Sequence, residues 1–325
     1  MQTFQASTPP QGSEHGTDLP ITVVILTRDE ELHIERAIGS VQPFARRVVV
    51  VDSGSSDGTA EIARLMGAEV IVHPFVTQAQ QFNWTLTQLP DETEWVLRLD
   101  ADEIIMPELA RAITASLPTL GAETTGVYLN RRMSFLGRSI RHAGLFPVKV
   151  LRLFRFGYGR SEDRWMDEHI VVDGGTTHLD GELLDDNLKP LTWWIAKHNS
   201  YASREVVDVL LQHEIHHNQH LEAGSQTSGK RWIKEKIYYR LPAGFRAFAY
   251  FLYRYVLRLG FLDGAKGAQF HILQGFWYRY LVDAKLNEVL YYQRQHDVDL
   301  ATAIERVLDI DVRIGRVLTL AESRN

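Results

Sequence analysis

The chain has 325 residues, of which 45% are hydrophobic and 23% are charged, and its formal net charge is −6 at pH 7. These values exclude a wholly disordered, collagen-like or coiled-coil chain and argue against a nucleic-acid binder. The absence of cysteine excludes disulfides, thiol nucleophiles and cysteine-bound metals. At about 150 residues per domain, the length predicts two domains or one domain with a large appendage.

Three segments differ in composition. Residues 1–19 are rich in Gln, Ser, Thr, Pro and Gly and predict a flexible leader rather than a secretion signal. Residues 20–225 predict an α/β domain, and residues 226–325 predict a helical extension. We expect no membrane-spanning helix, because no apolar run approaches the roughly 18 residues that a span requires.

Apolar runs of strand length alternate with helical spacing along the first hundred residues. The predicted strands are residues 21–26, 47–52, 69–72 and 94–100, and the predicted helices are 31–41, 57–66 and 79–89. Strands without polar alternation are typical of a parallel sheet that helices cover on both faces. We therefore predict a doubly wound α/β domain, followed by short strands at 126–134 and 148–154 and by helices from Thr192.

Polar clusters follow three of these strands, at the sheet edge where open α/β proteins bind ligands. They are Thr27–Glu30, Asp52–Thr59 and Asp100–Glu103. The second cluster is rich in Gly and Ser and can cradle a phosphate, although it matches neither known phosphate-loop motif. The alternative is a turn that only caps the next helix, through Ser56 or Asp57.

The third cluster places Asp100 and Asp102 at alternate positions of an extended chain, so both carboxylates lie on one side. Two neighbouring negative charges favour a compensating cation. Mg²⁺ or Mn²⁺ prefers a few carboxylate oxygens and shares its remaining positions with water and phosphates. The alternative is a solvated acidic pair followed by a helix start between Glu103 and Glu108.

The motifs T-R-D-E at 27–30, V-V-V-D-S-G-S-S-D-G-T at 49–59 and L-R-L-D-A-D-E at 97–103 together resemble the family 2 glycosyltransferases. The similarity covers about residues 20–175. It implies the GT-A fold, with a mostly parallel central sheet flanked by helices. It also implies inverting transfer of a hexosyl group from a nucleotide-diphosphate donor, such as a UDP-sugar, with Mg²⁺ or Mn²⁺ as cofactor.

The same resemblance assigns residues to the donor site. It implies that Thr27, Asp29 and Glu30 border the nucleoside, that Asp52 pairs with the base, and that Asp102 holds the metal.

Four further residues complete the predicted donor site. Arg28, Ser53, Asn83 and Asp100 are expected to contact the donor, and Asp100 also the metal. Before Asn83 this chain carries glutamine and phenylalanine residues where many family members carry Arg or Lys.

Inverting transfer also needs a general base on the acceptor hydroxyl. The candidate is in Arg164–His169, where Glu168 lies 66 residues after Asp102 and Asp167 precedes it. We predict Glu168 as the base, with Asp167 second. The alternative is that this acid pair forms salt bridges with Arg160 or Arg164.

A rival motif lies at His213–His217, which satisfies H-E-x-x-H. In a zinc-dependent hydrolase, His213 and His217 would be ligands and Glu235 a possible third. The segment is rich in histidine, so a chance match is easy, and the motifs above supply a complete alternative site.

The segment from Gly229 to Gly260 carries eight Lys or Arg residues and one Glu, interleaved with aromatic residues. This composition suits the headgroup level of an anionic membrane, so we predict membrane contact through about residues 230–285. A helical hairpin packed on the catalytic domain is one alternative. Binding of single-stranded RNA is another, disfavoured by the acidic remainder of the chain.

Residues 165–169 and 275–285 are similar to the bacterial lipopolysaccharide-core β-1,4-glucosyltransferase type. This narrower resemblance implies a lipid-linked, lipopolysaccharide or other glycan acceptor. It also implies a cytoplasmic protein, peripheral on the cytoplasmic face of the inner membrane. The competing hypotheses are the zinc-dependent hydrolase and a non-catalytic module that binds membranes or nucleic acid.

Overall fold

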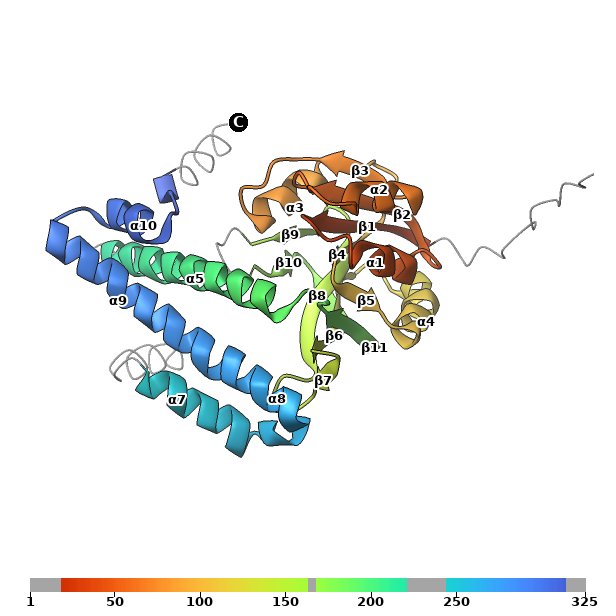
Figure 1. Ribbon diagram of the computed structural model, residues 1–325. Helices are drawn as coiled ribbons and strands as arrows, with labels where there is room; N and C mark the ends of the chain where they lie inside the picture. The colour runs from red at the N-terminus through yellow and green to blue at the C-terminus, as the bar shows by residue number, and fades with distance from the viewer. Residues whose placement is uncertain (1–18, 163–167, 221–243, 314–325) are drawn as a thin grey trace, which may run out of the picture.

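The protein is described by a computed structural model that covers residues 19–162, 168–220 and 244–313, with backbone alone for 212–220. In this part of the chain, nine strands form one sheet in the order β3-β2-β1-β4-β8-β6-β11-β5, with β7 beside β6 (Figure 1). The strands are β1 (Leu19–Thr27), β2 (Ala45–Asp52), β3 (Glu69–Val72), β4 (Trp95–Asp100), β5 (Glu103–Ile105), β6 (Thr124–Phe135), β7 (Arg138–Ile140), β8 (Val148–Arg155) and β11 (Gly175–Asp186).

Six of the nine strands, namely β1, β2, β3, β4, β6 and β11, run in the same direction, so the sheet is mostly parallel, as the sequence predicts. Strands β1 to β4 are parallel, β8 runs antiparallel between β4 and β6, and β5 is antiparallel to β11. A separate ribbon pairs β9 (Gly159–Ser161) with β10 (Ile170–Val172). The predicted α/β class is confirmed.

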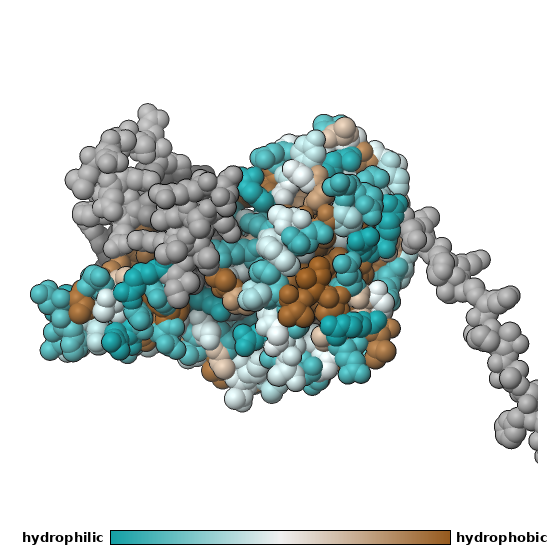
Figure 2. All heavy atoms as spheres, turned by 90° about the horizontal axis from the view of Figure 1, so that it is seen from above, coloured by the Kyte–Doolittle hydropathy of each residue, from teal (hydrophilic) through white to brown (hydrophobic). Residues whose placement is uncertain are grey.

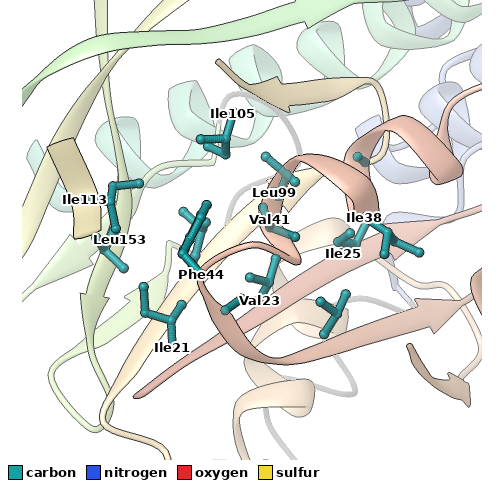
Figure 3. Close-up of a cluster of buried hydrophobic side chains, with 14 of the residues drawn as sticks. Ile21, Val23, Ile25, Ile38, Val41, Phe44, Leu99, Ile105, Ile113 and Leu153 are labelled. Carbon is teal, nitrogen blue, oxygen red and sulfur yellow. The ribbon is translucent and has the colours of Figure 1, made fainter. Parts of the chain in front are cut away.

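Helices cover both faces of the sheet. The helices of the α/β part are α1 (Ile34–Val41), α2 (Thr59–Leu65), α3 (Gln78–Leu86) and α4 (Pro107–Ser116), followed by the turn η1 (Leu117–Thr119). Strand β1 shows why both faces are covered, because Ile21, Val23 and Ile25 join the core beneath α1 (Figure 3), whereas Val24 joins Phe82 of α3 on the other face. Alternate residues of one apolar strand therefore belong to two different cores.

Two parts of the α/β domain differ from the sequence prediction. Residues 103–105 form strand β5 where a helix start was an alternative, and α4 begins only at Pro107. Strand β11 was not predicted, because its sequence is polar and lacks an apolar run. It is held by parallel pairing with β6. Within it, Gly181 has a φ of +102° and lies against the backbone of Leu109, so a side chain at this position would clash.

The C-terminal helices lie to one side of the sheet (Figure 1). They are α5 (Leu191–His220), α7 (Phe245–Leu252), α8 (Gly264–Phe270), α9 (Tyr278–His296) and α10 (Leu300–Leu308). Between them lie two π-helical segments, η2 (Tyr253–Leu257) and η4 (His271–Trp277), and one 3-10 turn, η3 (Gly260–Asp263). In the described residues, no helix is both long enough and apolar enough to cross a membrane.

A separate hydrophobic core joins helices α5, α9 and α10. Val206 of α5 packs with Val282 and Val289 of α9 and with Ile304 of α10. The helical packing therefore starts at α5, before the predicted domain boundary. That boundary, near residue 225, and the predicted leader at 1–18 lie outside the described residues.

One contact joins the C-terminal helices to the sheet, and another joins two of these helices to each other. Phe135 of β6 and Phe270 of α8 pack edge-on at a centroid distance of 5.4 Å, beside Trp194 of α5. Arg246 of α7 forms a buried ion pair with Asp283 of α9. The cationic group of Arg246 is therefore not on the surface, in contrast to what the membrane prediction for this segment implies.

The packing beneath α1 predicts a matched pair of stability effects. Ile38 is fully buried, so Ile38→Ala should lower the free energy of unfolding by about 2–5 kcal/mol. Leu65 is 81% exposed, so Leu65→Ala should change it by no more than about 0.5 kcal/mol. Urea denaturation followed by circular dichroism measures both, and equal losses would contradict the packing described here.

Candidate active site

A cavity of about 1010 Å³ lies at the carboxyl ends of β1 and β4. Eight of the residues predicted from the sequence line it: Thr27, Arg28, Asp29, Glu30, Ser53, Asp100, Asp102 and Glu168. Asp52 and Asn83 do not line it, and Asp167 lies outside the described residues. The structure thus brings the residues after β1, β2 and β4, together with Glu168, around one cavity.

The loops after β1 and β2 hold each other through reciprocal hydrogen bonds. The Asp29 amide donates to Ser55 Oγ at 2.8 Å, and the Ser56 amide donates to Asp29 Oδ1 at 2.7 Å. The Glu30 amide donates to Thr59 Oγ1 at 2.7 Å. Asp29 has a φ of +54°, which is uncommon for a residue other than glycine, and these bonds stabilise it.

Asp52 organises the second loop from beneath the cavity. Its carboxylate accepts hydrogen bonds from Thr27 Oγ1 at 3.2 Å, from the Gly54 amide at 3.0 Å and from the Ser55 amide at 2.9 Å, and also from Ser55 Oγ. A carboxylate has about four acceptor positions, so this loop uses them all. The contact between Asp52 and a base stays a prediction, while the adjacent Ser53 lines the cavity.

Asn83 joins two elements beside the cavity. Its amide nitrogen donates to the Ser161 carbonyl at 2.9 Å, and its amide oxygen accepts from the Ser161 nitrogen at 2.8 Å. These bonds tie α3 to β9. The structure therefore gives Asn83 a structural role, and its contact with the donor stays a prediction.

Arg152 of β8 lies between two acidic residues of the third motif. One of its terminal nitrogens is 2.7 Å from Asp100 Oδ2 and 2.6 Å from Glu103 Oε1. Glu103 Oε2 in turn accepts the Asp100 amide at 3.0 Å, which closes the turn between β4 and β5. Both Arg152 and Glu103 are almost fully buried.

The charges in this cluster shift its pKa values in opposite directions. Burial acts to raise the pKa of Asp100, but Arg152 and Arg98 outweigh it and hold this pKa far below its usual range. Burial raises the pKa of Glu103, against the charge of Arg152. Arginine therefore supplies the positive charge beside Asp100 that the sequence analysis assigned to a metal alone.

Asp102 is the carboxylate of the motif that Arg152 does not neutralise. One of its oxygens accepts a hydrogen bond from the Asn187 amide at 2.9 Å. Burial, followed by the charge of Asp102, raises the pKa of the neighbouring Asp185 to about 7. The sequence analysis missed Asp185, at the polar end of β11, and Asn187, which follows that strand, because this part of the sequence carries no motif.

The segment after β11 crosses to the first loop. Lys189 Nζ lies 3.0 Å from Glu30 Oε1. The Leu188 amide donates to His33 Nε2 at 2.8 Å, so His33 carries its proton on Nδ1 and donates to Glu30 Oε2 at 2.6 Å. Glu30 is therefore held from two sides at the cavity wall.

Glu168 stands at the base of the ribbon formed by β9 and β10. The Glu162 amide donates to the His169 carbonyl at 2.9 Å and closes this base. Burial raises the pKa of Glu168, with Arg98 and Arg204 acting against that shift. Arg160 pairs instead with Asp173, at 3.5 Å, so the alternative salt bridge from Arg160 to Glu168 is not formed.

The rival zinc motif falls where side chains are not described. The positions of the His213, His216 and His217 side chains, and all of Glu235, lie outside the described parts. Among the side chains that the structure does describe, no group of three or more His, Asp or Glu residues is placed to hold a metal.

Comparison with known proteins identifies the family. Residues 22–179 match the model of glycosyl transferase family 2. The lipopolysaccharide core biosynthesis glycosyltransferase LpsC of Rhizobium meliloti is 30% identical over 197 residues, which cover 57% of this chain and 70% of that protein. The chain belongs to the family 2 glycosyltransferases. Its mixed, mostly parallel sheet is the expected GT-A fold.

Two further matches cover a smaller share of this chain than LpsC does. An uncharacterized glycosyltransferase of Rickettsia bellii is 42% identical over 89 residues, so the chain spans 30% of that relative and the match takes 27% of this chain. The crystal structure of glucosyl-3-phosphoglycerate synthase from Mycobacterium tuberculosis with Mn²⁺, UDP and phosphoglyceric acid is 26% identical. It covers 34% of this chain and 43% of its own, with a TM-score of 0.30.

The Arg152 cluster predicts a pH-dependent stability defect. Arg152→Met leaves the buried Glu103 and the partly exposed Asp100 without this cation, so the free energy of unfolding should fall by about 3–5 kcal/mol at pH 7. Without the arginine, both folded-state pKa values rise, and that of Glu103 moves further above its unfolded value, so the folded variant gains protons and recovers stability as the pH falls.

The measurement is urea unfolding of the parent and the variant at pH 7 and pH 5. The difference between them should shrink at pH 5. Arg152→Lys retains a cation and should lose less stability than Arg152→Met. A constant or growing difference at pH 5 would contradict the charge assignment.

Proposed function

We propose that this protein is an inverting, metal-dependent glycosyltransferase that uses a nucleotide-diphosphate sugar, favouring a UDP-sugar, as donor. The observation that carries the proposal is one cavity lined by both Asp102 and Glu168. In this proposal, Asp102 serves the diphosphate end of the donor and Glu168 serves the acceptor hydroxyl. Cationic side chains from Arg28, Arg131 and Lys197 line the same cavity and favour an anionic leaving group.

The donor set fits Mg²⁺ or Mn²⁺. Magnesium is commonly bound by one or two carboxylates together with substrate phosphates and water. Asp102 supplies such a carboxylate, with Asp100 beside it on the cavity wall. The bound ion would neutralise charge that develops on the departing diphosphate.

Glu168 acts as the general base in this mechanism. Its carboxylate takes the proton of the acceptor hydroxyl, while that oxygen bonds to the anomeric carbon and the bond to the diphosphate breaks. Attack opposite the leaving group inverts the configuration, and the proton remains on Glu168. Burial raises the pKa of this carboxyl, which makes it a better proton acceptor than an exposed glutamate.

Replacement of the base tests this role. Glu168→Gln should lower kcat by about 10²–10⁴-fold and leave UDP binding intact. In the parent, kcat/KM should fall as the pH drops through the Glu168 pKa, since the protonated form cannot accept a proton. The midpoint of that limb should lie above the ordinary 4.5. The assay is UDP release across pH, and normal transfer by Glu168→Gln would exclude this base.

Replacement of the metal ligand tests the second role. Asp102→Asn keeps the size of the side chain but removes its charge, so turnover with Mg²⁺ or Mn²⁺ should be lost while the melting temperature is retained. EDTA should abolish parental turnover, and added metal should restore it. Turnover that survives both Asp102→Asn and EDTA would overturn the proposed metal role.

We further propose a lipid-linked or lipopolysaccharide-type acceptor at the cytoplasmic face of the inner membrane. The likeness to LpsC, named for lipopolysaccharide core biosynthesis, supports this acceptor class. A second support is an apolar surface, here called the α7 stripe, made by the exposed side chains of Phe245, Phe248, Leu252, Tyr253, Val256 and Leu257. Large exposed apolar patches are typical of membrane and partner contacts.

The α7 stripe has charge as well as apolar surface. Arg258, just after η2, is exposed, whereas Arg254 is half-buried and donates to the Tyr250 hydroxyl, and Arg246 is buried against Asp283. Figure 2 views the molecule from above, and the described residues on that face are mostly hydrophilic, apart from a compact apolar group. The stripe continues into η3 through Phe261 and Leu262, which are also exposed.

Vesicle binding tests this surface. The parent should cosediment with anionic vesicles and be only partly released at 1 M salt, where the Debye length falls to about 3 Å. Leu252→Ser with Leu257→Ser should weaken capture severalfold. The control is Leu65→Ser with Val72→Ser, which alters two exposed residues of the α/β domain. This double variant should bind the vesicles as the parent does. Equal capture of both double variants would exclude the α7 stripe.

A further inference from the structure

A second cavity, of about 250 Å³, opens beside Asp102. It shares a wall with the larger cavity through Asp102, Arg131, Lys197 and Tyr201, which line both. Its far wall comes from the C-terminal helices, through Phe270 of α8 and Gln274 of η4. The helical region therefore completes a compartment of the catalytic centre instead of only flanking it.

One part of this compartment is aromatic. Trp194 stacks on His198 with ring centroids 3.5 Å apart, and Phe135 meets Trp194 edge-on at 5.8 Å. Phe270 packs against Phe135 at 5.4 Å. These contacts fix the rings, so the wall offers a preformed apolar surface.

Another part is polar and incompletely paired. Gln274 Oε1 is buried without a well-formed hydrogen bond, and the Gln274 side chain lies beside His198, whose pKa it acts to raise. His198 donates from Nδ1 to the Trp194 carbonyl at 2.8 Å, and burial lowers its pKa to about 4. The ring is therefore neutral near pH 7 and leaves Nε2 as an acceptor. Lys197 and Asn187 add donor groups to the same walls.

The backbone at Gln274 is unusual. Segment η4 is a π-helical stretch between α8 and α9, and such insertions occur frequently at functional sites. Phe270 and Gln274 lie four residues apart, so both face the cavity, whereas Ile272 between them is exposed. One short segment thus meets the cavity on one side and solvent on the other.

We propose that this smaller cavity binds the terminal sugar ring of the acceptor, so that a hydroxyl of that ring points into the larger cavity, which Glu168 lines. The proposal rests on the proposed glycosyl transfer and adds the part of the acceptor that is recognised. A sugar ring combines an apolar face with hydroxyls that both donate and accept. It therefore matches aromatic walls, the Gln274 and His198 acceptors and the Lys197 donor together.

Other ligand classes match fewer of these groups. A phosphate dianion only accepts hydrogen bonds, so it would leave the buried Gln274 oxygen unpaired. A lipid chain would leave every polar group in the cavity unpaired. The volume, slightly below that of drug-sized pockets, suits a single ring.

The experiment uses the full chain with UDP and Mg²⁺ and a panel of methyl glycosides of glucose, galactose, mannose, N-acetylglucosamine and a heptose. Binding is followed by saturation-transfer NMR, and donor turnover is followed separately as UDP-sugar hydrolysis without acceptor. We expect at least one glycoside to bind. Gln274→Leu should weaken that binding about tenfold and leave the KM for donor hydrolysis unchanged.

Gln269→Leu is the matched control. Gln269 is exposed on α8, five residues before Gln274, and this change should affect neither measurement. Binding of no glycoside, or equal binding by the parent and Gln274→Leu, would overturn the sugar subsite. A raised donor KM in Gln274→Leu would assign the cavity to the donor and also overturn it. Absence of UDP-sugar hydrolysis in the parent would instead contradict the proposed transfer itself.

Discussion

The ion triad of Arg152 with Asp100 and Glu103 is the constraint on which the rest of the site depends. It is buried, it closes the turn after β4, and it joins that turn to β8 at distances of 2.7 Å and 2.6 Å. Because Arg152 pairs with Asp100 and Glu103, Asp102 is left at the cavity wall, where its neighbours are the Asn187 amide and the charge of Lys197. A turn that satisfied all of its carboxylates internally would have no charge to offer a ligand.

The other walls are joined to this turn by backbone hydrogen bonds. Asp186 donates its amide to the Asp102 carbonyl at 3.0 Å, and Arg36 of α1 binds Asp186 at 3.1 Å. The loops after β1, β2, β4 and β11 are therefore connected, so the positions of Glu30 and Asp102 depend on each other. Such connected loops preorganise a site before its substrate arrives.

The sequence predicted the parts of the fold and the site that local patterns encode. Apolar runs such as that of β1 predicted the parallel strands, and the residues after them predicted Thr27, Ser53 and Asp102 at one cavity. Strand β11 was missed because its pairing with β6 is long-range and its residues are polar. The contacts of Asn83 and Arg246 were missed for the same reason. Their partners, Ser161 and Asp283, are 78 and 37 residues away in the chain.

The central claim is that the cavity holds a nucleotide diphosphate through a metal on Asp102. Titration calorimetry of UDP with the parent and with Asp102→Asn, each with Mg²⁺ and with EDTA, tests it most directly. The account predicts that Mg²⁺ strengthens UDP binding to the parent at least tenfold and has little effect on Asp102→Asn. Equal UDP affinity of the parent with Mg²⁺ and with EDTA, or an unchanged Mg²⁺ effect in Asp102→Asn, would contradict it.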